Sequence, residues 1–246
     1  MMINLRENER LDDLNRNGYK IIQNPETFCF GMDAVLLSGF AQVKEGENVI
    51  DLCTGTGVIP ILMAAKYPMA KLYSGLEIQD ISVDMASRSV IYNDLQDKVK
   101  IVKGDVCVAG RLMGLSKYDV VTCNPPYMNE NHGLKNPKSV LAIARHEILC
   151  TLEDVIRESS RLLKVNGRLY MVHRPQRMVE IFDIMRKYKL EPKKIRLVHP
   201  YVDKEANMVL IEAIKGARPM LKVLPPLVIY EDQGKYTKEV INLYEE

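Results

Sequence analysis

Two hydrophobic patterns alternate along most of the chain. Short apolar runs are separated by stretches in which apolar residues recur every three or four positions, as at Val83, Ala86 and Val90. A short apolar run is typical of a buried strand, and the second pattern is typical of an amphipathic helix. Strands are predicted at residues 47–52, 71–78, 99–102, 118–123 and 167–173, and helices at 58–67, 81–95, 139–165 and 175–188. This alternation favours a parallel sheet with helices on both faces.

The C-terminal part of the chain departs from this alternation. Strands are expected at residues 195–199 and 207–213, joined by a short polar loop. Such a connection predicts an antiparallel hairpin that closes the sheet. We therefore expect an α/β fold built on a doubly wound, mostly parallel sheet of seven strands.

The segment before the first of these strands has its own pattern. A turn is expected at residues 15–18, short strands at 19–23 and 27–30, and a helix that begins with Asp33 as its cap and runs to Phe40. We interpret residues 1–46 as an N-terminal flap on a single domain that spans residues 1–246.

Composition narrows the class of protein. The 246 residues are 47% hydrophobic and 27% charged, as in ordinary globular chains, which excludes a disordered or collagen-like protein. The longest segment without a charge, from Leu52 to Ala65, is too short to span a bilayer. Charged residues begin at Arg6, where a secretory signal would need an apolar core. We expect a cytoplasmic protein with no membrane partner, and the oligomeric state stays open.

Cysteine and histidine spacing gives no sign of a metal. The five cysteines include no CxxC pair and the four histidines no HxxxH pair. Scattered thiols of this kind indicate free cysteines in a reducing compartment. The sequence therefore predicts no metal site.

Positive charge is concentrated in one part of the chain. Residues 161–196 hold 11 Lys and Arg against 3 Asp and Glu, although the net charge of the whole chain is only +2. Such a segment can form a surface for a polyanion. A solvated helix face with loop lysines would give the same pattern, and charge alone does not decide between the two.

The sharpest local motif is a strand that runs into a glycine turn and then a helix. Asp51 lies near the strand end, and Gly55 and Gly57 follow in the turn. Two glycines let the backbone approach a ligand at the carboxyl edge of a sheet. The third glycine of a dinucleotide motif is replaced by Pro60, and a carboxylate at Asp51 suits a cationic or amine-bearing ligand better than a pyrophosphate.

Two more acids end the next strands. Glu77 ends the second strand, where a carboxylate can accept both hydroxyls of a ribose. Asp105 follows the third strand and can accept from an adenine amine, with the backbone N–H of Val106 beside it. Singly, each could be a surface acid or a helix cap. Together with Asp51 they lie at three successive strand ends on one sheet edge, which predicts a nucleoside site.

The fourth strand ends in Asn124-Pro125-Pro126-Tyr127. Prolines fix the backbone and remove N–H donors, so the carbonyls can point outward. An asparagine oxygen, a free carbonyl and an aromatic ring can together hold a planar NH2 group. The alternative is a rigid turn with a half-buried tyrosine.

These motifs together resemble a class I S-adenosylmethionine-dependent methyltransferase that modifies amino groups. Including the segment from Phe30 to Leu37, residues 18–216 resemble the bacterial tRNA1(Val) (adenine-37-N6)-methyltransferase family. Thr56, inside the glycine turn, is a mild departure from the motif. The resemblance implies that S-adenosylmethionine is held by Asp51, Thr54, Gly55, Thr56, Gly57, Glu77, Ile78, Asp105, Val106 and Asn124.

The resemblance also implies a substrate and a mechanism. An adenine in the anticodon loop of tRNA would offer its amine to the Asn124 oxygen and the Pro125 carbonyl, while Tyr127 stacks on the base. Neutral acceptors suffice, so no general base is assigned. The catalytic residues are then Asn124, Pro125, Pro126 and Tyr127, and candidate substrate contacts are Tyr127, His132, Lys135, Lys138 and Arg145.

Three alternatives stay open. The acceptor could be an adenine of rRNA or DNA. It could also be a glutamine side chain of a protein, although such enzymes usually carry a helical domain before the glycine turn, and only 54 residues precede Gly55 here. A catalytically silent RNA-binding subunit is the alternative that is not an enzyme.

Overall fold

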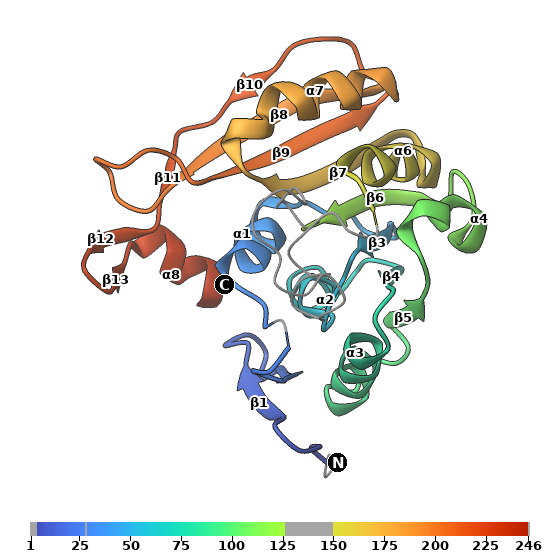
Figure 1. Cartoon of the computed structure of the whole chain (residues 1–246), viewed down its shortest axis with the longest axis vertical. Coiled ribbons are helices and arrows are strands. Elements are labelled where there is room, and N and C mark those ends of the chain that lie inside the picture. Colours follow the sequence, from blue (N-terminus) through green and yellow to red (C-terminus); the bar gives the residue numbers. More distant parts are fainter. Residues whose placement is uncertain (1–3, 28, 126–149, 246) are drawn as a thin grey trace.

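The computed structural model describes residues 4–27, 29–125 and 150–245. Its centre is a nine-stranded sheet in the order β10-β8-β9-β7-β6-β3-β4-β5, with β11 paired to β8 (Figure 1). The strands are β3 (Asn48–Leu52), β4 (Leu72–Glu77), β5 (Val99–Lys103), β6 (Tyr118–Cys123), β7 (Leu163–His173), β8 (Leu190–His199), β9 (Met208–Lys215), β10 (Lys222–Val223) and β11 (Leu227–Val228). Only β9 runs antiparallel to its neighbours among these described strands. The predicted fold class is confirmed, and two short strands extend the sheet beyond the predicted hairpin.

Helices cover both faces of the sheet. They are α1 (Met32–Phe40), α2 (Val58–Lys66), α3 (Asp80–Tyr92), η1 (Val106–Val108), α4 (Ala109–Met113), α6 (Leu152–Leu162), η2 (Pro175–Arg177), α7 (Met178–Lys187) and α8 (Lys238–Glu245). The helices α1, α2 and α3 lie on one side of the sheet and α4, α6 and α7 on the other (Figure 1). Along β3 the side chains alternate: Val49 packs in the core under the first three helices, and Ile50 in the core under the other three. Successive side chains of a strand point to opposite faces, so an unbroken apolar strand needs a cover on each side.

One predicted helix boundary is wrong. β7 begins at Leu163, whereas the sequence pattern extended the preceding helix to Val165. Asn166 has a φ of 63°, and the pairing of β7 with β6 shifts register between Tyr118 and Val120. A bulge of this kind lets the strand continue through a residue pair that sequence rules assign to a turn. Residues 139–149 of that predicted helix lie outside the described part of the chain.

The N-terminal segment forms a hairpin in which one strand falls within the predicted residues 19–23, whereas the other strand was not predicted. β1 (Arg10–Asp13) pairs antiparallel with β2 (Lys20–Gln23), whereas residues 27, 29 and 30 are not in a strand. Asn24 instead holds a turn, because its side chain accepts from the backbone of Glu26 and its carbonyl from that of Thr27. β2 packs on α3 through the buried bond from the Ile22 N–H to the Ser89 hydroxyl.

The start of α1 also differs from the expectation. Gly31 is the N-cap residue, and Asp33 lies inside the first turn, where its carboxylate accepts from the Ala34 N–H. The extended backbone of Gly31, with a φ of −111° and a ψ of −176°, fixes this earlier boundary. Asp33 is therefore not the cap.

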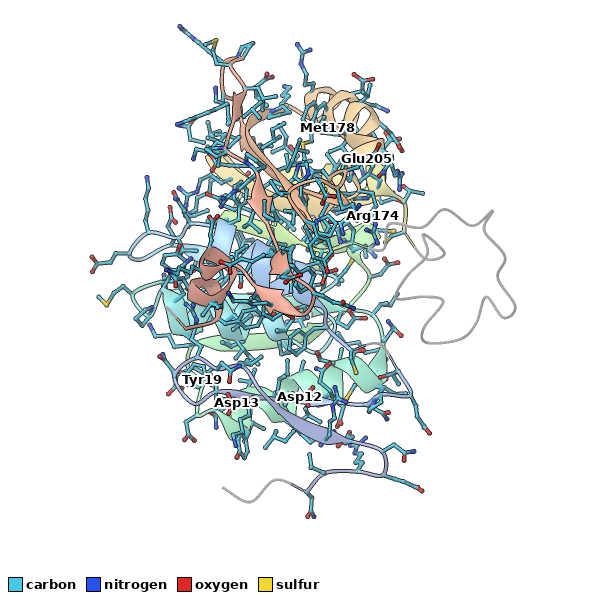
Figure 2. All side chains as sticks on the ribbon, turned by 90° about the vertical axis from the view of Figure 1, so that its left-hand side faces the viewer. Asp12, Asp13, Tyr19, Arg174, Met178 and Glu205 are labelled. Atoms are coloured by element: carbon cyan, nitrogen blue, oxygen red, sulfur yellow. The ribbon has the colours of Figure 1, made fainter. Side chains whose placement is uncertain are left out.

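The C-terminal residues form a further unit that sequence patterns did not predict. The hairpin of β12 (Tyr230–Asp232) and β13 (Lys235–Tyr236) leads into α8, which packs on α1. The Arg16 guanidinium donates to the Leu243 carbonyl, so the turn between β1 and β2 contacts α8. In Figure 2, Asp12, Asp13 and Tyr19 of the N-terminal segment lie at the opposite end of the long axis from Arg174, Met178 and Glu205.

Two negative findings concern the described residues alone. Among them no helix is long and apolar enough to cross a membrane. The same residues bring together no group of three His, Cys, Asp or Glu side chains that could hold a metal ion.

Candidate active site

Four strand ends carry the predicted site residues to one edge of the sheet. Asp51 of β3 lies opposite Gly75 of β4, and Leu52 lies opposite Cys123 of β6, one residue before Asn124. Glu77 of β4 lies opposite Lys103 of β5, two residues before Asp105. The parallel register therefore gathers Asp51, Glu77, Asp105 and Asn124 at the carboxyl edge, where open α/β sheets bind ligands.

The turn after β3 has a left-handed backbone. Cys53, Gly55 and Gly57 have φ values of 57°, 56° and 84°. No atom of the described residues lies within 4 Å of the position that a Cβ of Gly55 would take, whereas a Cβ at Gly57 would lie 3.1 Å from the Cβ of Ala86. Gly55 is therefore needed for its backbone conformation and open surroundings, and Gly57 also for close packing against α3.

Asp51 is the most perturbed acid of this edge. Its side chain is buried, and its Oδ1 accepts a hydrogen bond of 2.6 Å from the Thr122 hydroxyl. Its Oδ2 is buried and has no hydrogen-bond partner among the described residues. Burial, together with the nearby Glu77 carboxylate, raises the pKa of Asp51 to about 7, and the hydroxyls of Thr122 and Thr54 partly oppose this. A buried carboxylate without a partner is costly, so this oxygen marks a place for a donor or a cation.

Thr54 lies against the neighbouring strand at its closest point. Its N–H donates to the Leu76 carbonyl, and its buried hydroxyl lies beside the Asp51 carboxylate, whose pKa it lowers. A Cβ on Gly75 would come within 3.0 Å of that hydroxyl. The glycine in β4 therefore makes room for Thr54 at the base of the turn.

We expect Gly75→Ala to lower the free energy of unfolding by about 1–3 kcal/mol. The added Cβ would lie 2.8 Å from Cγ2 of Thr54 and 3.0 Å from Cδ1 of Ile101, so packed side chains must move. Urea unfolding measures the loss. Adding Thr54→Ser to Gly75→Ala removes Cγ2 and should recover part of the lost stability. A Gly75→Ala protein as stable as wild type would show that no such crowding exists.

Glu77 holds the turn from the side of β4. Its Oε2 accepts from the Gly55 N–H at 2.9 Å, and its Oε1 accepts from the Gln79 N–H at 2.9 Å. The Glu77 carbonyl in turn accepts from the Gly104 N–H. Glu77 is 5% exposed, and its carboxylate and backbone carbonyl together connect the ends of β3, β4 and β5.

Asp105 acts as a helix cap in this structure. Its Oδ1 accepts from the Cys107 N–H at 2.8 Å at the start of η1. Val106 is buried in the first position of η1, and Ile78 is partly buried directly after β4. The cap fixes the Asp105 carboxylate at the sheet edge.

Only half of the predicted catalytic turn is described. Asn124 is half-buried and Pro125 is buried at the end of β6. Pro126 and Tyr127 lie outside the described residues, as do the four other candidate substrate contacts His132, Lys135, Lys138 and Arg145.

Two thiols lie beside this turn, a buried one at Cys123 and a half-buried one at Cys53. Burial raises the pKa of Cys123, and that of Cys53 is raised most by its hydrogen bond with Cys123. Both thiols therefore stay protonated near neutral pH and pack as small hydrophobic groups.

Three polar residues at the site were not singled out from the sequence. Thr122 bonds Asp51, Gln23 bonds the glycine turn, and His173 ends β7 beside the catalytic turn. Burial and the nearby Arg177 charge lower the pKa of His173 to about 4, so its imidazole is neutral at pH 7. The sequence does contain one signal that could have identified such residues, a polar residue within an apolar run. Thr122 shows this signal most clearly.

The basic segment 161–196 is largely neutralised by acids. At least eight of its eleven cationic side chains form ion pairs with carboxylates. These cations are Arg161, Lys164, Arg168, Arg177, Arg186, Lys187, Lys194 and Arg196. Six of the eight partners lie outside the segment, so most of its local excess of positive charge is balanced by acids from other parts of the fold.

Comparison with known proteins decides the family. Residues 19–189 match the family described as methyltransferase small domain, a span that includes the glycine turn and all four strand ends. The chain belongs to this family. A member of the methyltransferase small domain family is an enzyme that transfers a methyl group, which agrees with a ligand site at the carboxyl edge.

Several curated relatives match most of the chain. A protein of Porphyromonas gingivalis is 27% identical over 87% of this chain and 86% of its own length. One of Pedobacter heparinus is 25% identical over 89% of this chain and 92% of its own length. Both are named tRNA1(Val) (adenine(37)-N6)-methyltransferase.

Solved structures show the same fold. A predicted O-methyltransferase of Agrobacterium tumefaciens superimposes with a TM-score of 0.70 at 25% identity, over 87% of this chain and 95% of that one. Geranyl diphosphate methyltransferase in complex with SAM gives a TM-score of 0.54 at 16% identity, over 75% of this chain and 84% of that one. The second likeness supports the class I methyltransferase fold alone.

Proposed function

We propose that this protein transfers the methyl group of S-adenosylmethionine to the exocyclic N6 amine of an adenine in tRNA, at position 37 of the anticodon loop. The observation that supports the substrate most strongly is the agreement of the relatives, which cover 85% or more of this chain in several cases and share one name. A tRNA substrate places the action of the protein in the cytoplasm.

S-adenosylmethionine is the methyl donor of this enzyme class, and the carboxyl edge fits it. The buried Asp51 Oδ2 has no hydrogen-bond partner among the described residues, and the space beside Gly55 is open. A buried carboxylate oxygen of this kind suits the ammonium of the methionine part. When bound, the cofactor supplies an electrophilic methyl group on a sulfonium, so the protein needs only to bind and orient.

The remaining site residues would contact different parts of the cofactor, each from a different strand end. Glu77 can accept from the ribose hydroxyls while its oxygens also hold the Gly55 and Gln79 amides. Asp105 and the backbone of Val106 would bind the adenine ring, with Ile78 beside it. Thr56 and Gly57 complete the glycine turn that carries the methionine part.

The end of β6 would orient the acceptor amine. The side-chain oxygen of Asn124 and the carbonyl of Pro125 can accept the two N–H bonds of a planar amine, which directs the nitrogen lone pair toward the methyl group. Pro125 is fixed at the end of a buried strand, so these acceptors are positioned before the substrate arrives. Tyr127 would stack on the base, as aromatic side chains do on splayed RNA bases.

We expect cofactor affinity to fall as the pH drops below about 7. In the ligand-free protein the pKa of Asp51 is about 7, whereas a bound ammonium would favour the ionised carboxylate. Binding must then release a proton at lower pH, and the Kd should rise up to about ten-fold per pH unit. Titration calorimetry from pH 6 to pH 8 measures this, with Asp51→Asn as the reference, because that variant retains only the titration of the ligand itself. The same pH dependence in both proteins would exclude Asp51 as the titrating group.

The substrate is tested with labelled S-adenosylmethionine and separate fractions of tRNA, rRNA, DNA and release factors. We expect label in tRNA alone, and in a tRNA1(Val) transcript only when adenine occupies position 37. Label in rRNA or DNA would move the acceptor to another nucleic acid. Label in protein alone would favour glutamine methylation, and no transfer to any fraction by a protein that binds the cofactor would favour the silent RNA-binding subunit.

A further inference from the structure

A buried amide at the end of β2 connects three distant parts of the fold. Gln23 is 0% exposed, and its Nε2 donates to the Thr56 hydroxyl oxygen at 2.6 Å and to the Ile22 carbonyl at 3.0 Å. Its Oε1 accepts from the Phe30 N–H at 3.1 Å. One side chain thus joins the N-terminal hairpin, the glycine turn and the backbone that leads into α1.

Burial of an amide side chain destabilises the folded state unless each of its polar atoms forms a hydrogen bond. An unpaired amide group in the interior is strongly destabilising, and Gln23 avoids this only while all three segments stay in place. The Gln23 side chain therefore joins these three segments specifically. An apolar residue of similar size could fill the same space without requiring any of the three partners.

The glycine turn needs support from outside. Thr56 is 4% exposed and lies between Gly55 and Gly57, both of which have a positive φ. Glycines make the turn possible but do not fix its conformation. Glu77 holds the turn at the Gly55 amide, and Gln23 holds it at the next residue from the side of β2.

We infer that Gln23 is a positioning residue that couples cofactor binding at the glycine turn to the docking of Phe30 and the start of α1. A ligand that selects one conformation of the turn strengthens the bond between Thr56 and Gln23, and through it the bond to the Phe30 amide. Coupling of this kind is reciprocal, so an ordered Phe30 amide also raises cofactor affinity. The inference rests on cofactor binding at the turn and does not depend on which acceptor is methylated.

The test compares isosteric changes at the two ends of the bond, with S-adenosylhomocysteine as the probe in titration calorimetry. We expect Gln23→Met and Thr56→Val each to raise the Kd about ten-fold, because both remove the hydrogen bond between these two side chains; Gln23→Met also removes the bonds to Ile22 and Phe30. The double variant should be no weaker than either single one, because both remove the same connection. Thr56→Ser retains the hydroxyl and should recover most of the affinity that Thr56→Val loses. Additive losses in the double variant would overturn the inference.

Ser89→Ala is the matched control for hairpin stability. It removes the other buried bond of β2, from the Ile22 N–H to the Ser89 hydroxyl at 2.9 Å, without touching the glycine turn. We expect it to lower the free energy of unfolding while leaving the Kd within about two-fold of wild type. A loss of affinity equal to that of Thr56→Val would show that the hairpin acts only through general stability.

Hydrogen exchange gives a second measurement that a purely structural role would not change. In the wild type, saturating S-adenosylhomocysteine should slow exchange of the Phe30 amide about ten-fold or more. In Thr56→Val, ligand at equal saturation should leave this amide at its ligand-free rate while the Gly55 amide is still protected. Equal protection of Phe30 in both proteins would overturn the coupling. A wild type that does not bind the probe at all would instead contradict the cofactor assignment.

Discussion

Asn124→Ala is expected to lower kcat about 100- to 1000-fold while changing the Kd for S-adenosylmethionine less than about five-fold. The variant removes one of two neutral acceptors that would draw the amine hydrogens away from the methyl donor. The Pro125 carbonyl cannot replace it, because a proline at the end of a buried strand has little freedom to move. Single-turnover methylation of tRNA measures the chemical step, and calorimetry measures the affinity.

Asn242→Ala, an exposed asparagine on α8, controls for nonspecific effects of the substitution. We expect it to methylate at the wild-type rate. An Asn124→Ala protein that stays fully active would mean that the end of β6 does not hold the acceptor amine. A proportional loss of cofactor affinity would instead assign Asn124 to the cofactor.

Asp51→Asn is expected to weaken cofactor binding about 100-fold at pH 8. Asparagine can still accept from Thr122, but it presents an amide in place of the unpartnered Oδ2 and carries no charge for the ammonium. Calorimetry with S-adenosylmethionine at pH 8 gives the change. An affinity within three-fold of wild type would place the ammonium elsewhere.

The same substitution should stabilise the ligand-free protein at pH 8. The pKa of Asp51 is raised from 3.8 to about 7 in the folded state, so its favourable contribution is complete at low pH and is lost as the pH rises through 7. Above pH 7 the wild type carries a buried, ionised carboxylate, which destabilises the folded state. We expect Asp51→Asn to remove this effect and to raise the free energy of unfolding, measured in urea, by about 1–3 kcal/mol. At pH 5 Asp51 is protonated in the folded protein but ionised in the unfolded chain, so the variant should keep a smaller advantage there, and the difference between the two proteins should grow as the pH rises from 5 to 7. A less stable variant at pH 8 would show that the ionised group is better solvated than its burial indicates.

The sheet and the placement of the acids could be predicted from the sequence because they follow from local rules. Apolar runs locate β3, β4, β5 and β6, and the carboxyl ends of parallel strands share one edge. Asp51, Glu77, Asp105 and Asn124 therefore come together without any knowledge of packing. The chemical roles of these residues stay predictions.

What could not be predicted depends on contacts between distant residues. Gln23 and Thr56 are 33 positions apart, and nothing near either residue indicates that they bond. Charge is similar: Arg168 pairs with Glu47 and Lys164 with Asp119, so the basic segment has far less free charge than a local count suggests. The start of β7 was predicted wrongly for a related reason. The bulge opposite Tyr118 depends on the pairing of β7 with β6, which a local sequence pattern does not contain.

The order of the strands has a consequence for any shortened form of the protein. The family match stops at residue 189, whereas β8 and β9 follow it, and β9 pairs with β7 from Arg168 to His173. A fragment that ended with the match would leave that side of β7 with a row of unpaired amides and carbonyls. An open, apolar strand of this kind recruits other chains, so the fragment would aggregate rather than bind ligand.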